Sequence, residues 1–140
     1  MWGDLKQMDQ RGAIPMVTIE IPDVQLLVAD DDRAFRETVV EILAPRFHII
    51  AVESAEQALE IFGTTDVHLA LFDMHMHVMS GLDAIRWLRE NQLEIPCILL
   101  TSDLSPEIED QAHELQTFSV LRKPPRQQQL IDTISCALEL

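Results

Sequence analysis

The sequence has no apolar run long enough to cross a membrane. A transmembrane helix needs about 18 or more consecutive apolar residues, and no segment approaches that length. The first ten residues, MWGDLKQMDQ, also lack the apolar stretch of a signal peptide. We therefore expect a cytoplasmic protein without a membrane partner.

Basic residues and cysteines are both scarce. Ten Lys and Arg stand against 24 Asp and Glu, and the formal net charge of −14 opposes non-specific attraction to nucleic acid or anionic lipid. Direct nucleic-acid binding is therefore not expected. The two cysteines, Cys97 and Cys136, lack the close spacing of a metal or redox pair. Because they lie in the apolar patterns PCILL and ISCAL, we expect both side chains to be buried.

Apolar runs of strand length alternate with segments of helical periodicity. A length of 140 residues with 47% hydrophobic content suits one domain with one core. Strands that are continuously apolar are buried on both faces, and their alternation with helices predicts a parallel sheet with right-handed crossovers. No glycine-rich turn follows the first run, which excludes a dinucleotide-binding fold. The predicted strands are QLLVAD (25–30), HIIAVE (48–53), LALFD (69–73), CILLTS (97–102) and SVLRKP (119–124).

These patterns predict a three-layer α/β sandwich over residues 23–140. Residues 1–22 show mixed polarity and no sustained period, so we interpret them as an amino-terminal tail or extension. Within that tail, MVTIEI (16–21) could pair as a short edge strand.

Several helices carry recognisable start signals. Ser54 to Gln57 has the form of a capping box, Ser105-Pro106 offers an N-cap and a first-turn proline, and Asp32 is expected to cap the first helix. Apolar stripes at helical spacing are interpreted as core rather than as cofactor contacts. They comprise Phe35, Val39, Ile42 and Leu43; Ala58, Leu59 and Phe62; Leu82, Ile85 and Leu88; Ile108, Ala112 and Leu115; and Leu130, Ile131, Ile134 and Leu138.

Polar residues end four of the five predicted strands. In open α/β sheets, ligands bind outside the carboxyl ends of the strands, so these residues are expected to meet at one rim. Three converging carboxylates would repel one another unless they shared a cation, and an all-oxygen site of this kind suits Mg²⁺. The residues concerned are Asp30, Asp31 and Asp32 after the first strand, Asp73 at the third, Thr101 and Ser102 at the fourth, and Lys123 and Pro124 at the fifth.

The other rim residues suit phosphoryl chemistry. Lys123 can pair with a carboxylate or phosphate oxygen, and the Thr101 hydroxyl can donate to an anion that stands on Asp73. Phosphoryl transfer onto a carboxylate depends mostly on positioning and charge neutralisation. The pattern therefore predicts a phospho-acceptor site.

With these residues in place, the sequence resembles the response-regulator receiver family over about residues 24–139. The matching segments are LLVADDD, LALFDMHMHVMSGLDAIRWLR, IPCILLTS and VLRKPP. The resemblance implies a flavodoxin-like fold, with a five-stranded parallel sheet in the order 2-1-3-4-5 and five helices.

The same resemblance implies a role for each site residue. Asp73 would be phosphorylated, and Asp30 and Asp31 would hold Mg²⁺ together with Asp73 and the backbone carbonyl of His75. Thr101 would be the switch hydroxyl. Lys123 would bind phosphate and be joined to Pro124 by a cis peptide bond.

By this resemblance the protein is expected to be a single-domain response regulator. It would accept a phosphoryl group from a histidine kinase or phosphotransfer protein and change its binding to an unknown downstream protein; a homodimer is left open. It would not be an enzyme, although it would assist its own phosphorylation and dephosphorylation. One alternative is an interaction module of the same fold that does not depend on phosphorylation. Another is an aspartyl-phosphate phosphatase, although Asp73-Met74-His75 lacks that class's Asp-x-Asp.

The sequence also departs from the family pattern. Val120 replaces an aromatic residue, so we expect the signal to leave through the loops at 102–106 and 77–81 instead of through a rotating ring. His75 and His77 alternate as transition-metal ligands can, but no third and fourth ligand are apparent at workable spacing. The other departures are His77 for proline, Gln116-Thr117 for Gly-Ala and Pro125 for phenylalanine.

Overall fold

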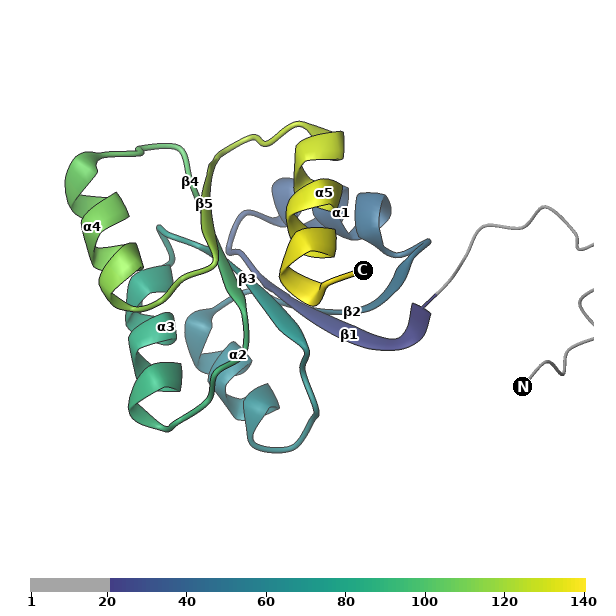
Figure 1. Cartoon of the computed structure of the whole chain (residues 1–140), viewed down its shortest axis with the longest axis horizontal. Coiled ribbons are helices and arrows are strands. Elements are labelled where there is room, and N and C mark those ends of the chain that lie inside the picture. Colours follow the sequence, from purple (N-terminus) through teal and green to yellow (C-terminus); the bar gives the residue numbers. More distant parts are fainter. Residues whose placement is uncertain (1–20) are drawn as a thin grey trace, which may run out of the picture.

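The computed structural model describes residues 21–140, which form five strands and five helices in alternation (Figure 1). The sheet order is β2-β1-β3-β4-β5, and every neighbouring pair is parallel. The predicted fold and strand order are therefore confirmed. The elements are β1 (Ile21–Ala29), α1 (Arg33–Leu43), β2 (Phe47–Val52), α2 (Ala55–Phe62), β3 (Leu69–Asp73), α3 (Gly81–Glu90), β4 (Cys97–Thr101), α4 (Pro106–Glu114), β5 (Ser119–Arg122) and α5 (Gln127–Leu138).

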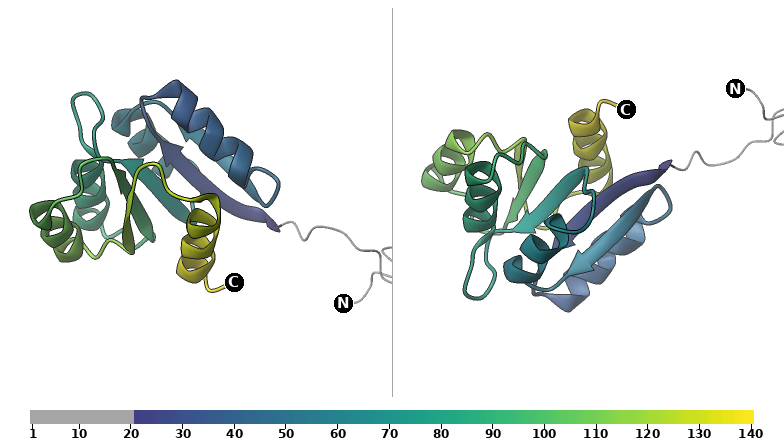
Figure 2. Two further views of the ribbon diagram at one scale, coloured as in Figure 1. Left: turned by 90° about the horizontal axis from the view of Figure 1, so that it is seen from above. Right: turned by 90° about the horizontal axis from the view of Figure 1, so that it is seen from below.

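The sheet lies between two groups of helices (Figure 2). α1 and α5 cover one face, where a core cluster includes Val39, Leu43 and Ile134. α2, α3 and α4 cover the other face, where the core includes Ile85 and Ala112. Every residue of β3 and β4 is buried, because these strands lie inside the sheet and have helices on both faces. The middle strands thereby provide a rigid support for the residues at their ends.

The helices α1 to α4 begin at side-chain caps, as predicted for three of them, whereas α5 begins after Arg126 without one. Asp32, Ser54 and Ser105 each accept a hydrogen bond from the backbone three residues later. The capping box expected at Ser54 is incomplete, because the Gln57 side chain accepts from the amide of Glu53 instead. A complete box occurs at α3, between Ser80 and Asp83.

The first strand begins earlier than predicted. β1 starts at Ile21 and not at residue 25, so it includes the last part of the segment interpreted as a tail. Ile21 pairs with Phe47, and the register shifts between Ile21 and Gln25. Because β3 joins β1 only from Leu26 onward, the early part of β1 pairs with β2 alone among residues 21–140, and Pro22 is tolerated there. The edge strand considered for residues 16–21 falls almost wholly outside the described residues.

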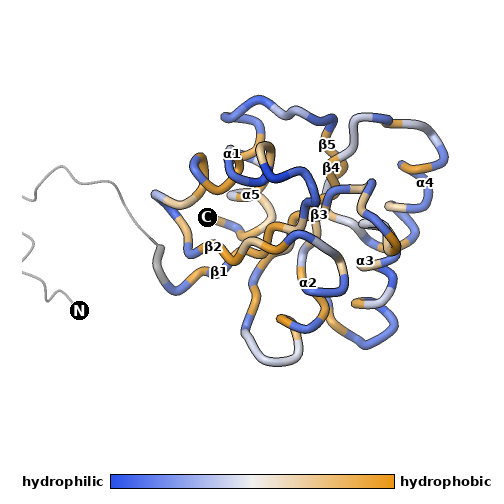
Figure 3. Tube along the Cα trace, turned by 180° about the vertical axis from the view of Figure 1, so that it is seen from behind, coloured by the Kyte–Doolittle hydropathy of each residue, from blue (hydrophilic) through white to orange (hydrophobic). Residues whose placement is uncertain are grey.

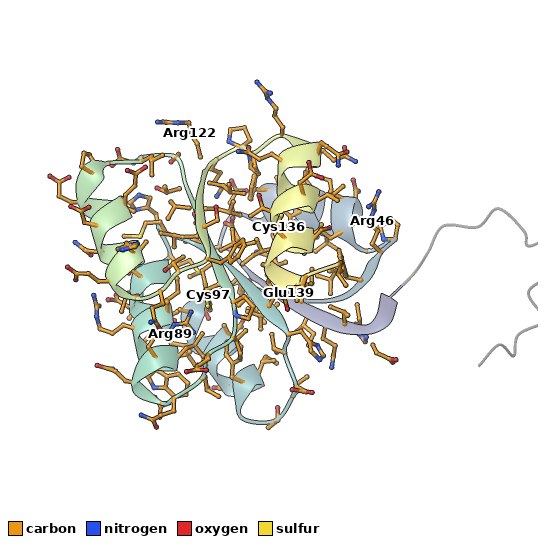
Figure 4. The ribbon with its side chains drawn as sticks, viewed as in Figure 1. Arg46, Arg89, Cys97, Arg122, Cys136 and Glu139 are labelled. Atoms are coloured by element: carbon orange, nitrogen blue, oxygen red, sulfur yellow. The ribbon has the colours of Figure 1, made fainter. Side chains whose placement is uncertain are left out.

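One of the two cysteine predictions is wrong. Cys97 is buried in β4, but Cys136 is exposed on α5 (Figure 4). Cys136 lies two positions after the buried Ile134, and a separation of two residues places side chains on different sides of a helix. Its apolar neighbours in the sequence therefore did not indicate burial.

Hydrophobic character follows the strands, whereas the loop between β1 and α1 is strongly hydrophilic (Figure 3). Among residues 21–140, no helix has the length and apolar character needed to cross a membrane.

Candidate functional site

Three carboxylates meet where β1 and β3 end. Oxygen atoms of Asp30, Asp31 and Asp73 all lie within 4.8 Å of one another. Asp30 and Asp73 are almost fully buried, with 2% and 5% of their side chains exposed, whereas Asp31 is exposed. The expected acidic cluster therefore forms, and it has two buried members and one open to solvent. Such a set of hard oxygen ligands fits a divalent cation such as Mg²⁺.

Lys123 brings a positive charge to this cluster from the end of β5. Its Nζ lies 2.9 Å from Asp30 Oδ2 and 3.4 Å from Asp73 Oδ1. The peptide bond between Lys123 and Pro124 is cis, as expected. One ammonium group thus faces two buried carboxylates, and negative charge remains in excess at the rim.

Burial raises the pKa of Asp73 to about 6. The charge of Asp30 adds to this shift, while Lys123 and a backbone hydrogen bond at His75 oppose it. For Lys123, burial acts to lower the pKa, but the hydrogen bond and charge of Asp30, together with Asp73, raise it above its ordinary value. The lysine therefore stays an ammonium. Ionised Asp73 destabilises the folded protein, and a bound cation would reduce that destabilisation.

Thr101 lies at the same rim, at the end of β4. The residue is fully buried, and its Oγ1 accepts a hydrogen bond of 3.0 Å from the amide of Asp103. Its carbonyl accepts from the Lys123 amide, which links the ends of β4 and β5. Since the hydroxyl acts as an acceptor here, its own hydrogen is free to donate to an anion.

The segment after β3 packs tightly against the site. A Cβ atom added to Gly81 would lie 2.5 Å from the carbonyl oxygen of Asp73 and 2.7 Å from Leu99, so only glycine fits without displacement. The amide of Gly81 also donates to the carbonyl of Met74. The side chains of His75 and His77 are exposed, and the structure brings neither of them into the acidic cluster. The use of the His75 carbonyl as a ligand stays a prediction.

Two residues in the first turn of α1 contact the site in ways that the sequence analysis missed. The Lys123 ammonium lies 4.3 Å from the centre of the Phe35 ring. Arg36 Nη1 donates to the backbone carbonyl of Asp30 at 2.6 Å. Phe35 was assigned only to the core, and Arg36 was given no role. Their position just after the Asp32 cap was the available signal, because the start of α1 lies beside the carboxyl end of β1.

Solved structures of receiver domains share this fold. The Francisella response regulator 1452 receiver domain superposes with a TM-score of 0.79 at 20% identity, over 84% of this chain and 98% of that one. A response regulator receiver domain protein from Methanospirillum hungatei gives a TM-score of 0.78 at 20% identity, over 87% of this chain and 95% of that one.

Curated relatives match in sequence as well. The sensory/regulatory protein RpfC of Xanthomonas campestris is 30% identical over 120 residues, which cover 82% of this chain and 16% of that protein. The heme response regulator HssR of Staphylococcus saprophyticus is 32% identical over 114 residues, covering 81% of this chain and 50% of that protein. The chain thus spans from about a sixth to a half of the length of these two relatives. Residues 26–135 match the response regulator receiver domain as a family. The chain belongs to the response regulator receiver domain family.

Proposed function

We propose that Asp73 accepts a phosphoryl group, with the assistance of Mg²⁺, and that the protein thereby acts as a single-domain response regulator. The observation that supports this most directly is the buried Asp73 carboxylate, which lies beside two further carboxylates and one lysine. Receiver domains work with histidine kinases and phosphotransfer proteins, and we propose such a protein as the phosphoryl donor.

Asp30, Asp31 and Asp73 would hold the cation, together with the carbonyl of His75. The cation would neutralise charge as the phosphoryl group arrives. In the transfer step, an oxygen of Asp73 forms a bond to phosphorus as the bond from phosphorus to the donor's histidine nitrogen breaks. Lys123 would then pair with a phosphoryl oxygen, and the free hydrogen of the Thr101 hydroxyl would be donated to another.

The change in Asp73 would be read out by a protein partner. An added phosphoryl group brings roughly −1.5 to −2 charges, which should draw Thr101 and Lys123 inward. Val120 is half-buried and packs against the core on the side of α2, α3 and α4, so it can follow this movement only passively. We propose that the segment from Ser102 to Pro106 and the segment from His77 to Gly81 form the altered surface. We expect the protein to be cytoplasmic and to meet its protein partners there.

Labelling with a small phosphoryl donor tests the proposal. Incubation with acetyl phosphate and Mg²⁺ should add the mass of one phosphoryl group, measured on the intact protein. Asp73→Asn, or excess chelator, should abolish the addition. Asp66→Asn is the matched control, because Asp66 is an exposed aspartate that precedes β3 at the opposite end of the sheet.

Equal labelling of wild type and Asp73→Asn would contradict the proposal. If the wild type is not labelled at all, an interaction module that does not depend on phosphorylation becomes the better interpretation. Continuous hydrolysis of a phosphomonoester substrate would instead favour a phosphatase.

A further inference from the structure

We infer that Phe35 is a positioning residue, whose ring holds the Lys123 ammonium where it can meet an incoming phosphoryl group. The inference rests on the proposed phosphoryl acceptance by Asp73. The Lys123 Nζ atom lies 4.3 Å from the centre of the Phe35 ring. A cation over an aromatic face at such a distance is attracted by the negative charge of the ring's face.

The surroundings strengthen this contact. The Lys123 side chain is only 16% exposed, and Phe35 is half-buried against the core between the sheet and α1 and α5. Because water is largely kept away from the ammonium, the attraction to the ring is stronger than at an open surface.

The ring also differs in kind from the other two partners of Lys123. Asp30 and Asp73 are the carboxylates that would bind the cation, and Asp73 would in addition carry the phosphoryl group. Their hold on Lys123 must therefore weaken when the site is loaded. A neutral ring binds neither metal nor phosphate, so Phe35 is the contact that can persist in both states.

The local backbone fixes where the ring stands. The amide of Phe35 donates to the Asp32 side chain at 3.2 Å, and the amide of Asp32 donates to Asp30 Oδ1 at 2.9 Å. Two hydrogen bonds thus connect the backbone of Phe35, through Asp32, to Asp30 in the turn after β1. The backbone at the start of α1 thereby fixes the position of the ring without the ring itself hydrogen-bonding to a carboxylate that would bind the cation.

Substitution of Phe35 separates a packing role from a positioning role. Phe35→Leu retains an apolar side chain but removes the ring, whereas Phe35→Tyr retains the ring. Ile42→Val is the matched control, because Ile42 is also half-buried on α1 and packs against the same core without contacting Lys123. The measurements are the affinity for Mg²⁺ by calorimetry and the Mg²⁺-dependent affinity for BeF₃⁻ by ¹⁹F NMR.

For Phe35→Leu, we expect BeF₃⁻ affinity to fall about three- to tenfold, the effect of one cation–π contact. Its Mg²⁺ affinity should not decrease, because the ring does not hold the carboxylates that bind the cation. Phe35→Tyr and Ile42→Val should bind BeF₃⁻ within about twofold of the wild type. Phe35→Leu binding BeF₃⁻ as well as the wild type would overturn the inference, and so would a parallel loss of Mg²⁺ affinity.

A second measurement keeps this inference separate from the proposed function. The ring should shift the side-chain CH₂ resonances of Lys123 upfield in wild type and Phe35→Tyr, but not in Phe35→Leu. Absence of that shift in the wild type would overturn the inference directly. If the shift is present but the wild type binds no BeF₃⁻, the proposed function is wrong, and the part that Phe35 plays in phosphoryl binding is wrong with it.

Discussion

The two ends of the parallel sheet are held together in different ways. At the carboxyl end, the loops are held by local hydrogen bonds, such as Asp103 to Thr101 and Asp32 to Asp30, while Lys123 joins the distant ends of β1 and β5. At the amino end of β4 and β5, Arg89 joins distant segments: its guanidinium donates to four backbone carbonyls, at Leu93, Ile95, Leu115 and Gln116. Figure 4 shows Arg89 near one end of the sheet and Arg122, the last residue of β5, near the other.

The difference separates the part of the molecule that can change from the part that stays fixed. The Asp30 and Asp73 carboxylates share one ammonium group, and burial together with the charge of Asp30 raises the pKa of Asp73. Arg89 instead finds four acceptors for its one positive charge, and these tie the loops before β4 and β5 to α3. Loops with local hydrogen bonds can rearrange one at a time, whereas loops that share a guanidinium move together or not at all.

The largest expected effect comes from breaking the fixed end. Arg89→Met retains the aliphatic part of the side chain but leaves four carbonyls without their donor. We expect the free energy of unfolding to fall by about 3 kcal/mol in urea titrations. Arg86→Met is the matched control, because Arg86 lies on the same helix and, within the described part of the chain, its one ion pair is the exposed contact with Asp83 at 3.3 Å. A loss of about 0.5 kcal/mol or less is expected there. Similar losses in the two variants would contradict the special position of Arg89.

The next largest effect has the opposite sign and lies at the site. Asp73→Asn removes a buried charge that its surroundings disfavour, so the metal-free protein should gain about 2 kcal/mol of stability at pH 7.5. Thermal unfolding in the presence of chelator measures this gain. Added Mg²⁺ should stabilise the wild type more than the variant, because the cation binds the ionised Asp73. If the metal-free variant is less stable than the metal-free wild type, then ionised Asp73 does not destabilise the folded protein.

The pH dependence of this gain follows from the pKa of Asp73, which is about 6 in the folded protein against an ordinary value of 3.8. Between these two values the folded state binds more protons than the unfolded state, so wild-type stability falls as pH rises toward 6. The advantage of Asp73→Asn should therefore be complete above about pH 7 and shrink as pH falls from 6 to 4. An advantage that does not change over this range would contradict the assignment to the Asp73 carboxylate.

The grouping of the site residues at the carboxyl ends of the strands was predictable from the sequence, because the strand and helix order follows from short-range patterns. Buried parallel strands show as continuous apolar runs, and once five of them alternate with helices, their carboxyl ends must share one rim. Asp30, Asp31, Asp73, Thr101 and Lys123 could thus be grouped from the sequence. The structure brings the side chains of the three aspartates and Lys123 together and places Thr101 at the end of β4, the strand beside β3.

Other features depend on contacts that the sequence does not display. The apolar stripe of α1 indicates that Phe35 faces inward, but not that its ring lies against Lys123, which comes from the other end of the chain. The same holds for the four carbonyls of Arg89. The early start of β1 depends on its pairing with β2 alone, and the exposure of Cys136 depends on which side of α5 faces the sheet.

The smallest expected effect is a redistribution of loops when the site is loaded, and it tests the comparison of the two ends directly. Ser105 caps α4 near the site, whereas Leu115 at the other end of α4 is held by Arg89. Arg89 holds the carbonyls of Leu115 and Gln116 at the end of α4. Movement of Thr101 toward the phosphoryl group should therefore displace the start of α4 more than its end. In the wild type, amide shifts caused by Mg²⁺ and BeF₃⁻ should be largest at residues 102–108, decline toward 115, and appear along 118–122, where β5 pairs with β4.

Two-dimensional NMR of the free and loaded protein measures this gradient. Shifts confined to residues that contact the metal would favour a phosphoryl sink over a switch, and shifts that increase toward 115 would show that Arg89 does not anchor α4.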